Sequence, residues 1–229
     1  FNNPEIFDFI LNNNGDPFVT NNNGENLFFY CLKYQKDKLL IKLLEKFNTI
    51  NLKNSEGENL LQSAISYDNS DIINYLLDNT KININNKTKE FGITALHQLV
   101  VMNKLDIIKK LVKLGADITV NSYLGNNIIH YALLENNNEL AEYFNSMNKI
   151  NLNNTNLNGD TPLHIFLSNE NKNYNIKFLE DLITNTNLNI QNHQGMTCLH
   201  LLVENNLLHK FRDILITKKL NIFIQNYQG

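Results

Sequence analysis

The sequence predicts an all-α fold, a solenoid in which helix–turn–helix units stack side by side and carry β-hairpin-like fingers. Three observations predict it. A glycine recurs every 33 to 36 residues, and each interval holds two apolar stretches with the spacing of one buried helical face. A polar stretch of about a dozen residues then leads to the next glycine. A period of this length is typical of stacked repeats, so the repeat is the unit of the fold.

Seven glycines mark the repeats: Gly24, Gly57, Gly92, Gly125, Gly159, Gly195 and Gly229. Their intervals are 33, 35, 33, 34, 36 and 34 residues. We therefore expect a single solenoid over residues 1–229, with a partial repeat at 1–23 and Gly229 as the start of a further repeat. The six complete repeats span residues 24–56, 57–91, 92–124, 125–158, 159–194 and 195–228.

The expected helices follow this order. Pro4 to Leu11 is predicted to form a second helix whose first helix is missing. The third repeat shows the full pattern, with a first helix over Thr94 to Met102 and a second helix from Leu105, whose apolar residues follow the i, i+3, i+4 spacing. Lys113-Leu114-Gly115 then supplies a helix stop, because glycine accepts the left-handed conformation found at helix C-termini.

Two helix starts have favourable local chemistry. Thr161 and Pro162 place a capping hydroxyl before a proline at the first helical position of the fifth repeat. Ser70 followed by Asp71 marks a second helix in the second repeat, with a carboxylate near the positive end of the helix dipole.

The two longest intervals predict insertions. One lies in the loop Asn85 to Phe91, and the other in the inter-helix turn around Ser168 to Asn175. Insertions in repeat proteins fall in loops and often on the binding face.

A short motif follows the glycines of the later repeats. It reads Gly159-Asp-Thr-Pro-Leu-His in the fifth repeat, and the third repeat's helix pair ends on Gly115-Ala116-Asp117. With the period, these motifs resemble the ankyrin repeat, over essentially the whole chain. In the first two repeats, Asn26-Leu-Phe-Phe and Asn59-Leu-Leu-Gln replace Thr-Pro-Leu-His. Both ends cut through a repeat, and arrays need polar capping repeats, so we expect the interior of a longer array.

Composition and charge exclude several classes of protein. The net charge is −3, the isoelectric point is about 6.1 and Arg212 is the single arginine, whereas nucleic-acid binding needs a dense basic stripe. No apolar run approaches the ~18–20 residues that insert across a membrane. The 45 asparagines would allow a disordered chain. The repeat register instead places them mainly before the glycines and in turns, where their side chains bond to the backbone.

The recurring histidines and the two cysteines are expected to be structural. The histidines are His97, His130, His164 and His200. Packed helices lie ~8–10 Å apart, so equivalent rings cannot share one zinc ion with ligands at ~2.0–2.3 Å. The ankyrin resemblance implies that each ring ties down the turn before a first helix. Cys31 and Cys198 lie five repeats apart, beyond the ~7 Å reach of a disulfide, and we expect reduced thiols in an intracellular, cytoplasmic or nuclear protein. Without catalytic or nucleotide-binding motifs, we expect no catalysis, metal or cofactor.

The resemblance also implies a groove, on the concave side, formed by fingers and first helices. The family's variable contact positions lie two and one residues before the glycine, one after it, and nine and ten after it. In the third and fourth repeats these positions are mostly apolar, and we predict that they form the centre of a partner-binding groove together with Tyr67. The residues are Phe91, Ile93, Val101, Met102, Tyr123, Leu124 and Leu134. In the alternative interpretation, the loop Asn85 to Phe91 folds back and covers them as core, and both interpretations stay open here.

Three functions fit these features. The favoured one is a non-catalytic scaffold that binds a protein or peptide in the groove. The second is a targeting or regulatory domain of a larger enzyme, because ankyrin arrays occur beside kinase, acyltransferase and GTPase-activating domains. The third is a structural spacer or capsid-type assembly protein, which predicts self-association and no discrete apolar patch.

Overall fold

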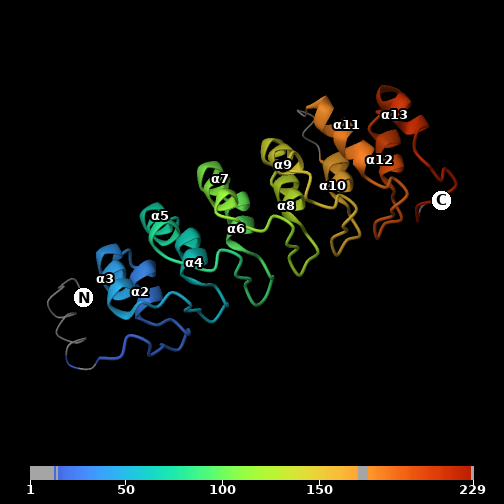
Figure 1. Cartoon of the computed structure of the whole chain (residues 1–229). Helices are drawn as coiled ribbons and strands as arrows, with labels where there is room; N and C mark the ends of the chain where they lie inside the picture. The colour runs from blue at the N-terminus through green and yellow to red at the C-terminus, as the bar shows by residue number, and fades with distance from the viewer. Residues whose placement is uncertain (1–12, 14, 170–174, 228–229) are drawn as a thin grey trace. The chain divides into compact units, whose positions relative to one another are not determined.

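The computed structural model describes residues 13, 15–169 and 175–227, so the helix expected at Pro4 to Leu11 lies outside the described residues. The chain divides into two compact units, Phe1–Leu99 (the first unit) and Val100–Gly229 (the second unit). The described residues of each unit form helices joined by loops, without an extended strand (Figure 1). The expectation of an all-α fold is confirmed.

The first unit consists of helix pairs. Its helices are α2 (Leu27–Lys33), α3 (Asp37–Phe47), α4 (Leu60–Ser66), α5 (Ser70–Asn79) and most of α6 (Ala95–Val101). Helix α2 packs against its partner α3 and also against α4, which packs against α5. Phe28, Leu40 and Leu60 have no exposed surface, so the core lies between the paired helices.

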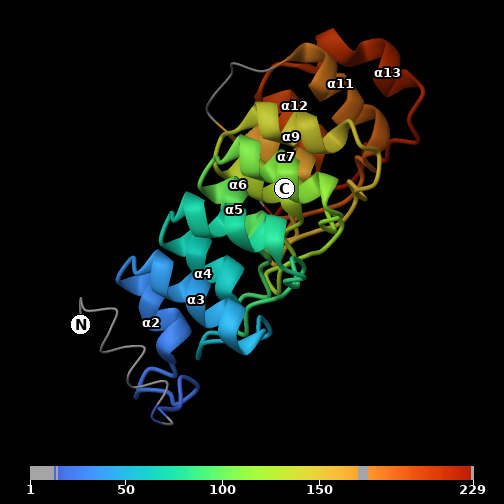
Figure 2. The same ribbon diagram turned by 60° about the vertical axis from the view of Figure 1, so that its left-hand side comes forward.

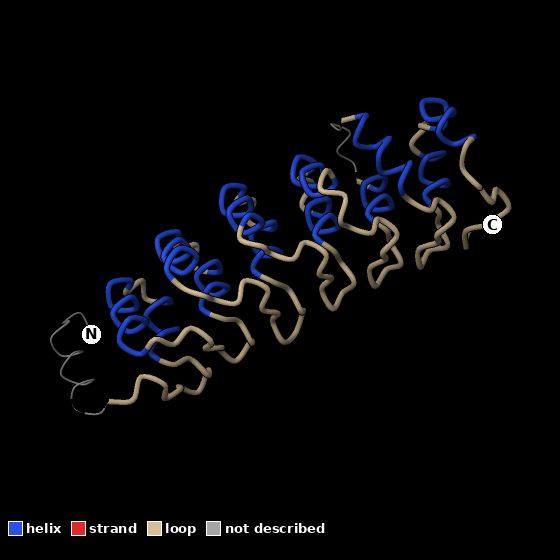
Figure 3. Tube along the Cα trace, viewed as in Figure 1, coloured by secondary structure: helices blue, strands red, loops and turns tan. Residues whose placement is uncertain are grey.

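The second unit continues the same pattern. After the end of α6 it contains α7 (Leu105–Lys113), α8 (Ile128–Leu134), α9 (Asn138–Asn145), α10 (Pro162–Ser168), α11 (Ile176–Asn185), α12 (Cys198–Glu204), the 3₁₀ helix η1 (Leu208–Phe211) and α13 (Arg212–Ile216). The first helices α8, α10 and α12 stack on one another, and α11 contacts both α10 and α13. Within each unit, the glycine-bearing loops leave the helix pairs on a common side (Figure 2; Figure 3).

The helix starts follow local capping chemistry. Thr161 caps α10 and Pro162 is its first residue, as predicted. Ser70 is the first residue of α5, as predicted, and the residue before it supplies the cap. The cap is Asn69, whose side-chain oxygen accepts a hydrogen bond from the backbone N–H of Ile72 at 3.1 Å. Asparagine ranks with serine among the preferred N-cap residues, so Asn69 satisfies one of the free backbone N–H groups at the start of α5.

The turns between paired helices use left-handed asparagines. Asn103, Asn136 and Asn206 have positive φ, and Asn48 does so as the C-cap of α3. Asparagine populates this region more readily than most residues because its short polar side chain bonds locally. The prediction that asparagine serves as a turn residue is confirmed here.

The fingers are tight turns and not strands. Their β-type pairing, among the described residues, is limited to isolated bridges between Lys53 and Asn59 and between Gln191 and Thr197. The hairpin-like form that we expected is therefore present as a turn with at most a single bridging pair.

Candidate interaction surface

Four of the fingers are held by an asparagine three residues before the glycine. The asparagines are Asn21, Asn54, Asn156 and Asn192, and each side-chain oxygen accepts the backbone N–H of the residue after the glycine at 3.0 Å. The glycine between them is required. Gly159 has a φ of +76°, and a Cβ atom there would lie 2.8 Å from the Cα atom of Asn192. The side chain after the glycine is thus fixed in direction.

Neighbouring fingers of the second unit are joined through their backbones. The N–H of Leu157 donates to the carbonyl of Leu124 at 2.9 Å, and the N–H of His193 donates to the carbonyl of Asn158 at 2.8 Å. These residues occupy the variable positions two and one before the glycine. Their side chains are therefore held in register from one repeat to the next.

Two of the recurring histidines, His130 and His164, link a first helix to the next finger. The Nδ1 atom of His164 accepts the N–H of Thr161 at 3.2 Å, and its Nε2 atom lies 3.2 Å from the carbonyl oxygen of Met196. Because Nδ1 accepts a hydrogen bond from the backbone, the proton of the neutral ring is on Nε2, which donates a hydrogen bond to the carbonyl oxygen. Burial lowers the pKa of His164, which favours the neutral ring. The prediction of a structural histidine is confirmed.

In the second repeat, where the histidine is absent, a glutamine forms the equivalent pair of hydrogen bonds. The Oε1 atom of Gln62 accepts the N–H of Asn59 at 3.3 Å, and its Nε2 atom donates to the carbonyl of Ile93 at 3.1 Å. An amide thus supplies the same acceptor and donor as a neutral imidazole. Although the second repeat lacks the Thr-Pro-Leu-His motif, its first helix is therefore still linked to the next finger.

Neither cysteine is placed for chemistry. Cys31 and Cys198 are both free and buried, and burial raises the pKa of each thiol to about 12. A thiol that stays protonated is a poor nucleophile and a poor metal ligand. Across the described residues, His, Cys, Asp and Glu side chains form no group that could hold a metal ion.

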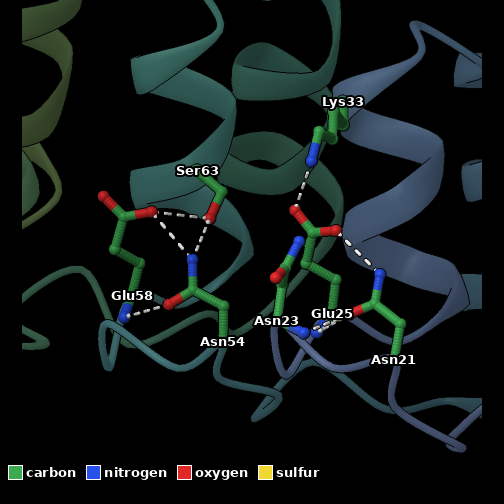
Figure 4. Close-up of polar contacts among 7 residues, drawn as sticks. All are labelled: Asn21, Asn23, Glu25, Lys33, Asn54, Glu58 and Ser63. Atoms are coloured by element: carbon green, nitrogen blue, oxygen red, sulfur yellow. Dashed lines mark hydrogen bonds and ion pairs between the residues drawn. The ribbon is translucent and has the colours of Figure 1, made fainter.

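Two carboxylates follow the glycines of the first two repeats and lie in equivalent positions (Figure 4). Glu25 forms an ion pair with Lys33, with 2.9 Å between Oε1 and Nζ, and accepts a hydrogen bond from Asn21 at 3.0 Å. The bond from Asn21, followed by the contact with Lys33, holds the pKa of Glu25 below its usual value. Glu58 instead accepts hydrogen bonds from four neutral donors among the described residues.

The donors to Glu58 come from three different segments. Asn54 and Ser63 each donate to one oxygen at 3.0 Å. Gln98 and Ser66 donate to the other oxygen, at 3.1 and 3.3 Å. The carboxylate is therefore held in a fixed orientation without a charged donor among these four groups.

Most of the predicted groove residues are exposed. In the first unit, Tyr67 follows α4, Phe91 lies in a finger, and Ile93 is half-buried. In the second unit, Met102 is also half-buried, and the other residues lie in a finger or at a helix end: Val101, Tyr123, Leu124 and Leu134. The six exposed residues show between 39% and 58% of their surface.

The inserted loop, Asn85 to Phe91, does not cover the exposed groove residues. Asn86 turns inward, where its Nδ2 atom donates to the carbonyl of Gly57 at 2.8 Å, and Thr88 is buried as well. Phe91, at the end of the same loop, stays 44% exposed. The loop therefore buries polar groups and leaves its aromatic ring outside. Partner binding at these residues stays a prediction.

The second unit also contains a hollow that the sequence did not reveal. Its volume is about 710 Å³, and it lies between first-helix ends and fingers of the fifth and sixth repeats. Its lining residues are Leu167, Ser168, Asn192, His193, Gln194, Met196, Leu201, Glu204, Asn205, Asn226 and Tyr227. Many of these are family contact positions, and they combine polar and apolar side chains, whereas the predicted groove uses the mostly apolar positions of the middle repeats.

Comparison with known sequences agrees with this geometry. A family model described as "Ankyrin repeats (3 copies)" matches residues 1–88 and 129–226, and one described as "Ankyrin repeats (many copies)" matches residues 96–144. The chain belongs to the ankyrin repeat family. The resemblance inferred from the glycine period is thus confirmed, and the ankyrin motif covers nearly the whole chain.

Several ankyrin repeat proteins are similar to this chain. A putative ankyrin repeat protein of Acanthamoeba polyphaga mimivirus is 30% identical over 270 residues, which cover 92% of this chain and 35% of the relative. The chain thus spans about a third of that relative's length. The Notch-regulated ankyrin repeat-containing proteins of Danio rerio and Homo sapiens are each 33% identical, over 39% and 38% of this chain and 81% and 79% of theirs.

Solved structures show the same ankyrin fold. The ankyrin repeat domain of Bcl-3, a member of the IkappaB protein family, superposes with a TM-score of 0.69 at 16% identity, over 93% of this chain and 91% of that one. In the part of the chain that the structure describes, every helix is too short or too polar to cross a bilayer.

Proposed function

We propose that this ankyrin repeat chain is a non-catalytic scaffold that binds a protein or peptide partner through the groove of its fingers and first helices. Ankyrin repeats are generally protein–protein interaction modules. The observation that carries the proposal is the distribution of exposed apolar side chains.

Eleven of the nineteen exposed large apolar side chains in the described residues lie on the fingers, on first helices or directly after them. They are Tyr30, Tyr34, Tyr67 and Phe91 in the first unit, and Val101, Tyr123, Leu124, Leu134, Leu157, Val203 and Tyr227 in the second. The second helices α3, α5, α7 and α9 contribute no exposed large apolar side chain, whereas α11 and α13 contribute one each, Ile176 and Ile216. Exposed apolar surface of this kind marks interaction sites, and aromatic anchors supply most of the binding energy at interfaces.

Selection of peptides tests this function. Random dodecapeptides displayed on phage are selected on the immobilised chain, and the affinity of the enriched peptides is measured for Phe91→Ala and Tyr123→Ala. Because anchors at the centre of an interface cost about 2 kcal/mol or more on truncation, each change should weaken binding at least about tenfold. The unfolding temperature should stay unchanged, since both rings are exposed.

Ile176→Ala is the matched control. This residue is 53% exposed but begins α11, a second helix, so its truncation should leave the affinity unchanged. Enriched peptides that lose affinity with Ile176→Ala and not with Phe91→Ala or Tyr123→Ala would contradict the groove. Failure to enrich any peptide would also count against a peptide-binding function.

The proposal also covers the cellular location of the protein and the class of its partner. Two free, buried thiols suit a reducing compartment, so we infer an intracellular location, cytoplasmic or nuclear. The net charge of −3 favours a protein partner over nucleic acid.

A further inference from the structure

The first two repeats place the same groups around two carboxylates, with one difference. Asn21 and Glu25 in the first repeat correspond to Asn54 and Glu58 in the second, since each asparagine lies three residues before the glycine and each glutamate one after it. In both repeats the asparagine amide donates to the carboxylate at 3.0 Å (Figure 4).

The difference lies nine residues after the glycine. There the first repeat has Lys33, whose ammonium lies 2.9 Å from Glu25, and the second repeat has Ser66, whose hydroxyl lies 3.3 Å from Glu58. The first repeat therefore shows how this arrangement binds a lysine ammonium. The second repeat has the same carboxylate without the ammonium.

We propose that a lysine or arginine of the partner binds Glu58 as Lys33 binds Glu25. The incoming cation takes the place of the Ser66 hydroxyl, which makes the longest of the four contacts to Glu58 and belongs to an exposed residue. This inference rests on the proposed function, and it specifies a basic partner segment.

The surroundings of Glu58 suit a cation. Its side chain is half-buried, so its charge is less screened by water than that of a fully exposed carboxylate. Tyr67 follows Ser66 directly and is 40% exposed, so its ring can pack against the aliphatic stem of a lysine or the plane of a guanidinium.

The distribution of basic residues points the same way. Helices α4, α6, α8, α10 and α12, all first helices, contain no lysine or arginine, whereas the second helices α3 and α7 contain three lysines each. A basic segment therefore meets no repelling charge on α4 itself. Lys33, on α2, is already neutralised by Glu25.

The peptides selected from the dodecapeptide library test the inference. They should be enriched in lysine or arginine, and Glu58→Gln should weaken their binding about tenfold to hundredfold, as expected for a hydrogen bond to a charged group. Ser66→Lys should weaken binding similarly, because it copies the first repeat and supplies Glu58 with an internal ammonium. Ser66 is exposed, so this second variant stays informative if Glu58→Gln impairs folding.

Glu45→Gln is the control for net charge. It removes one negative charge from an exposed position of α3, a second helix, and should leave binding unchanged. Equal losses for Glu45→Gln and Glu58→Gln would overturn the inference, because they would indicate a general charge effect. Selected peptides without basic residues, or unaffected by Glu58→Gln, would also overturn it. In that case the proposed function stands if Phe91→Ala and Tyr123→Ala still weaken binding, and falls if they do not.

Discussion

The Nε2 atom of His130 lies 3.1 Å from the carbonyl oxygen of Asp160, which joins the first helix of the fourth repeat to the finger of the fifth. The Nδ1 atom of the same ring accepts the backbone N–H of Asn127 at 3.1 Å, so the ring is neutral with its proton on Nε2. Burial lowers the pKa of His130 to about 4. The link between two repeats therefore depends on protonation.

We expect acid to weaken this link. A histidine pKa below its unfolded value of 6.5 means that protonation favours unfolding, so the stabilisation is complete above pH 6.5 and is lost as the pH falls towards 4. The loss amounts to at most about 3 kcal/mol for a shift of this size. Urea unfolding between these pH values measures it.

His130→Gln is the control for that titration. Gln62 makes the equivalent pair of bonds in the second repeat, so a glutamine at this position should keep the link but cannot titrate. The variant should fold at neutral pH and lose less stability than the wild type on acidification. An equal loss in both proteins would show that His130 is not the titrating group.

Removal of the cap hydroxyl at Thr161 should destabilise the second unit. Its Oγ1 atom lies 2.8 Å from Nδ1 of His164 and accepts the N–H of the same residue at 3.4 Å, at a fully buried position. Thr161→Ala should cost about 1–2 kcal/mol in the free energy of unfolding, measured with urea, because it leaves buried donors unpaired. Thr161→Ser keeps the hydroxyl and should cost clearly less. Equal costs would mean that the methyl group, and not the cap, stabilises the helix.

Asn156→Ala should loosen the finger of the fifth repeat. The side-chain oxygen of Asn156 accepts the N–H groups of Asn158 at 2.9 Å and Asp160 at 3.0 Å. Loss of about 1 kcal/mol from these bonds should speed amide hydrogen exchange at Asp160 several-fold to about tenfold. Asn156→Asp keeps the acceptor oxygen and should leave the exchange slow. Unchanged exchange in the alanine variant would show that other contacts hold the finger.

The thiols should react only after unfolding. With a pKa of about 12 and complete burial, Cys31 and Cys198 form almost no accessible thiolate at neutral pH. Titration with Ellman's reagent should therefore be slow in buffer and rapid in concentrated urea. Fast reaction of either thiol in buffer would contradict its buried position.

Features set by neighbouring residues could be predicted from the sequence. The pairing of helices follows from the apolar spacing, and the cap at Thr161 follows from one hydroxyl beside one proline. The departures in the second repeat proved harmless, because Asn59 and Gln62 reproduce the hydrogen bonds of threonine and histidine. The start of α5 at Ser70 agrees with the prediction, and Asn69 before it supplies the cap.

Features that depend on several repeats could not be predicted in this way. The hollow beside Glu204 arises from the relative positions of α10, α12 and two fingers, and polar and apolar side chains line it together. The donors to Glu58 are similarly spread, because Gln98 lies 40 residues away in the chain. By contrast, the exposed positions of Phe91 and Tyr123 agree with the predicted register, which places them one and two residues before a glycine.

Nuclear magnetic resonance mapping of a selected peptide on the labelled chain tests the central claim most directly. If the fingers and first helices bind the partner, the largest backbone shift changes should occur around Tyr67, Phe91 and Tyr123. Residues of the second helices α3 and α7 should change little. The largest changes on α3 and α7, with the fingers unaffected, would contradict this account of the molecule.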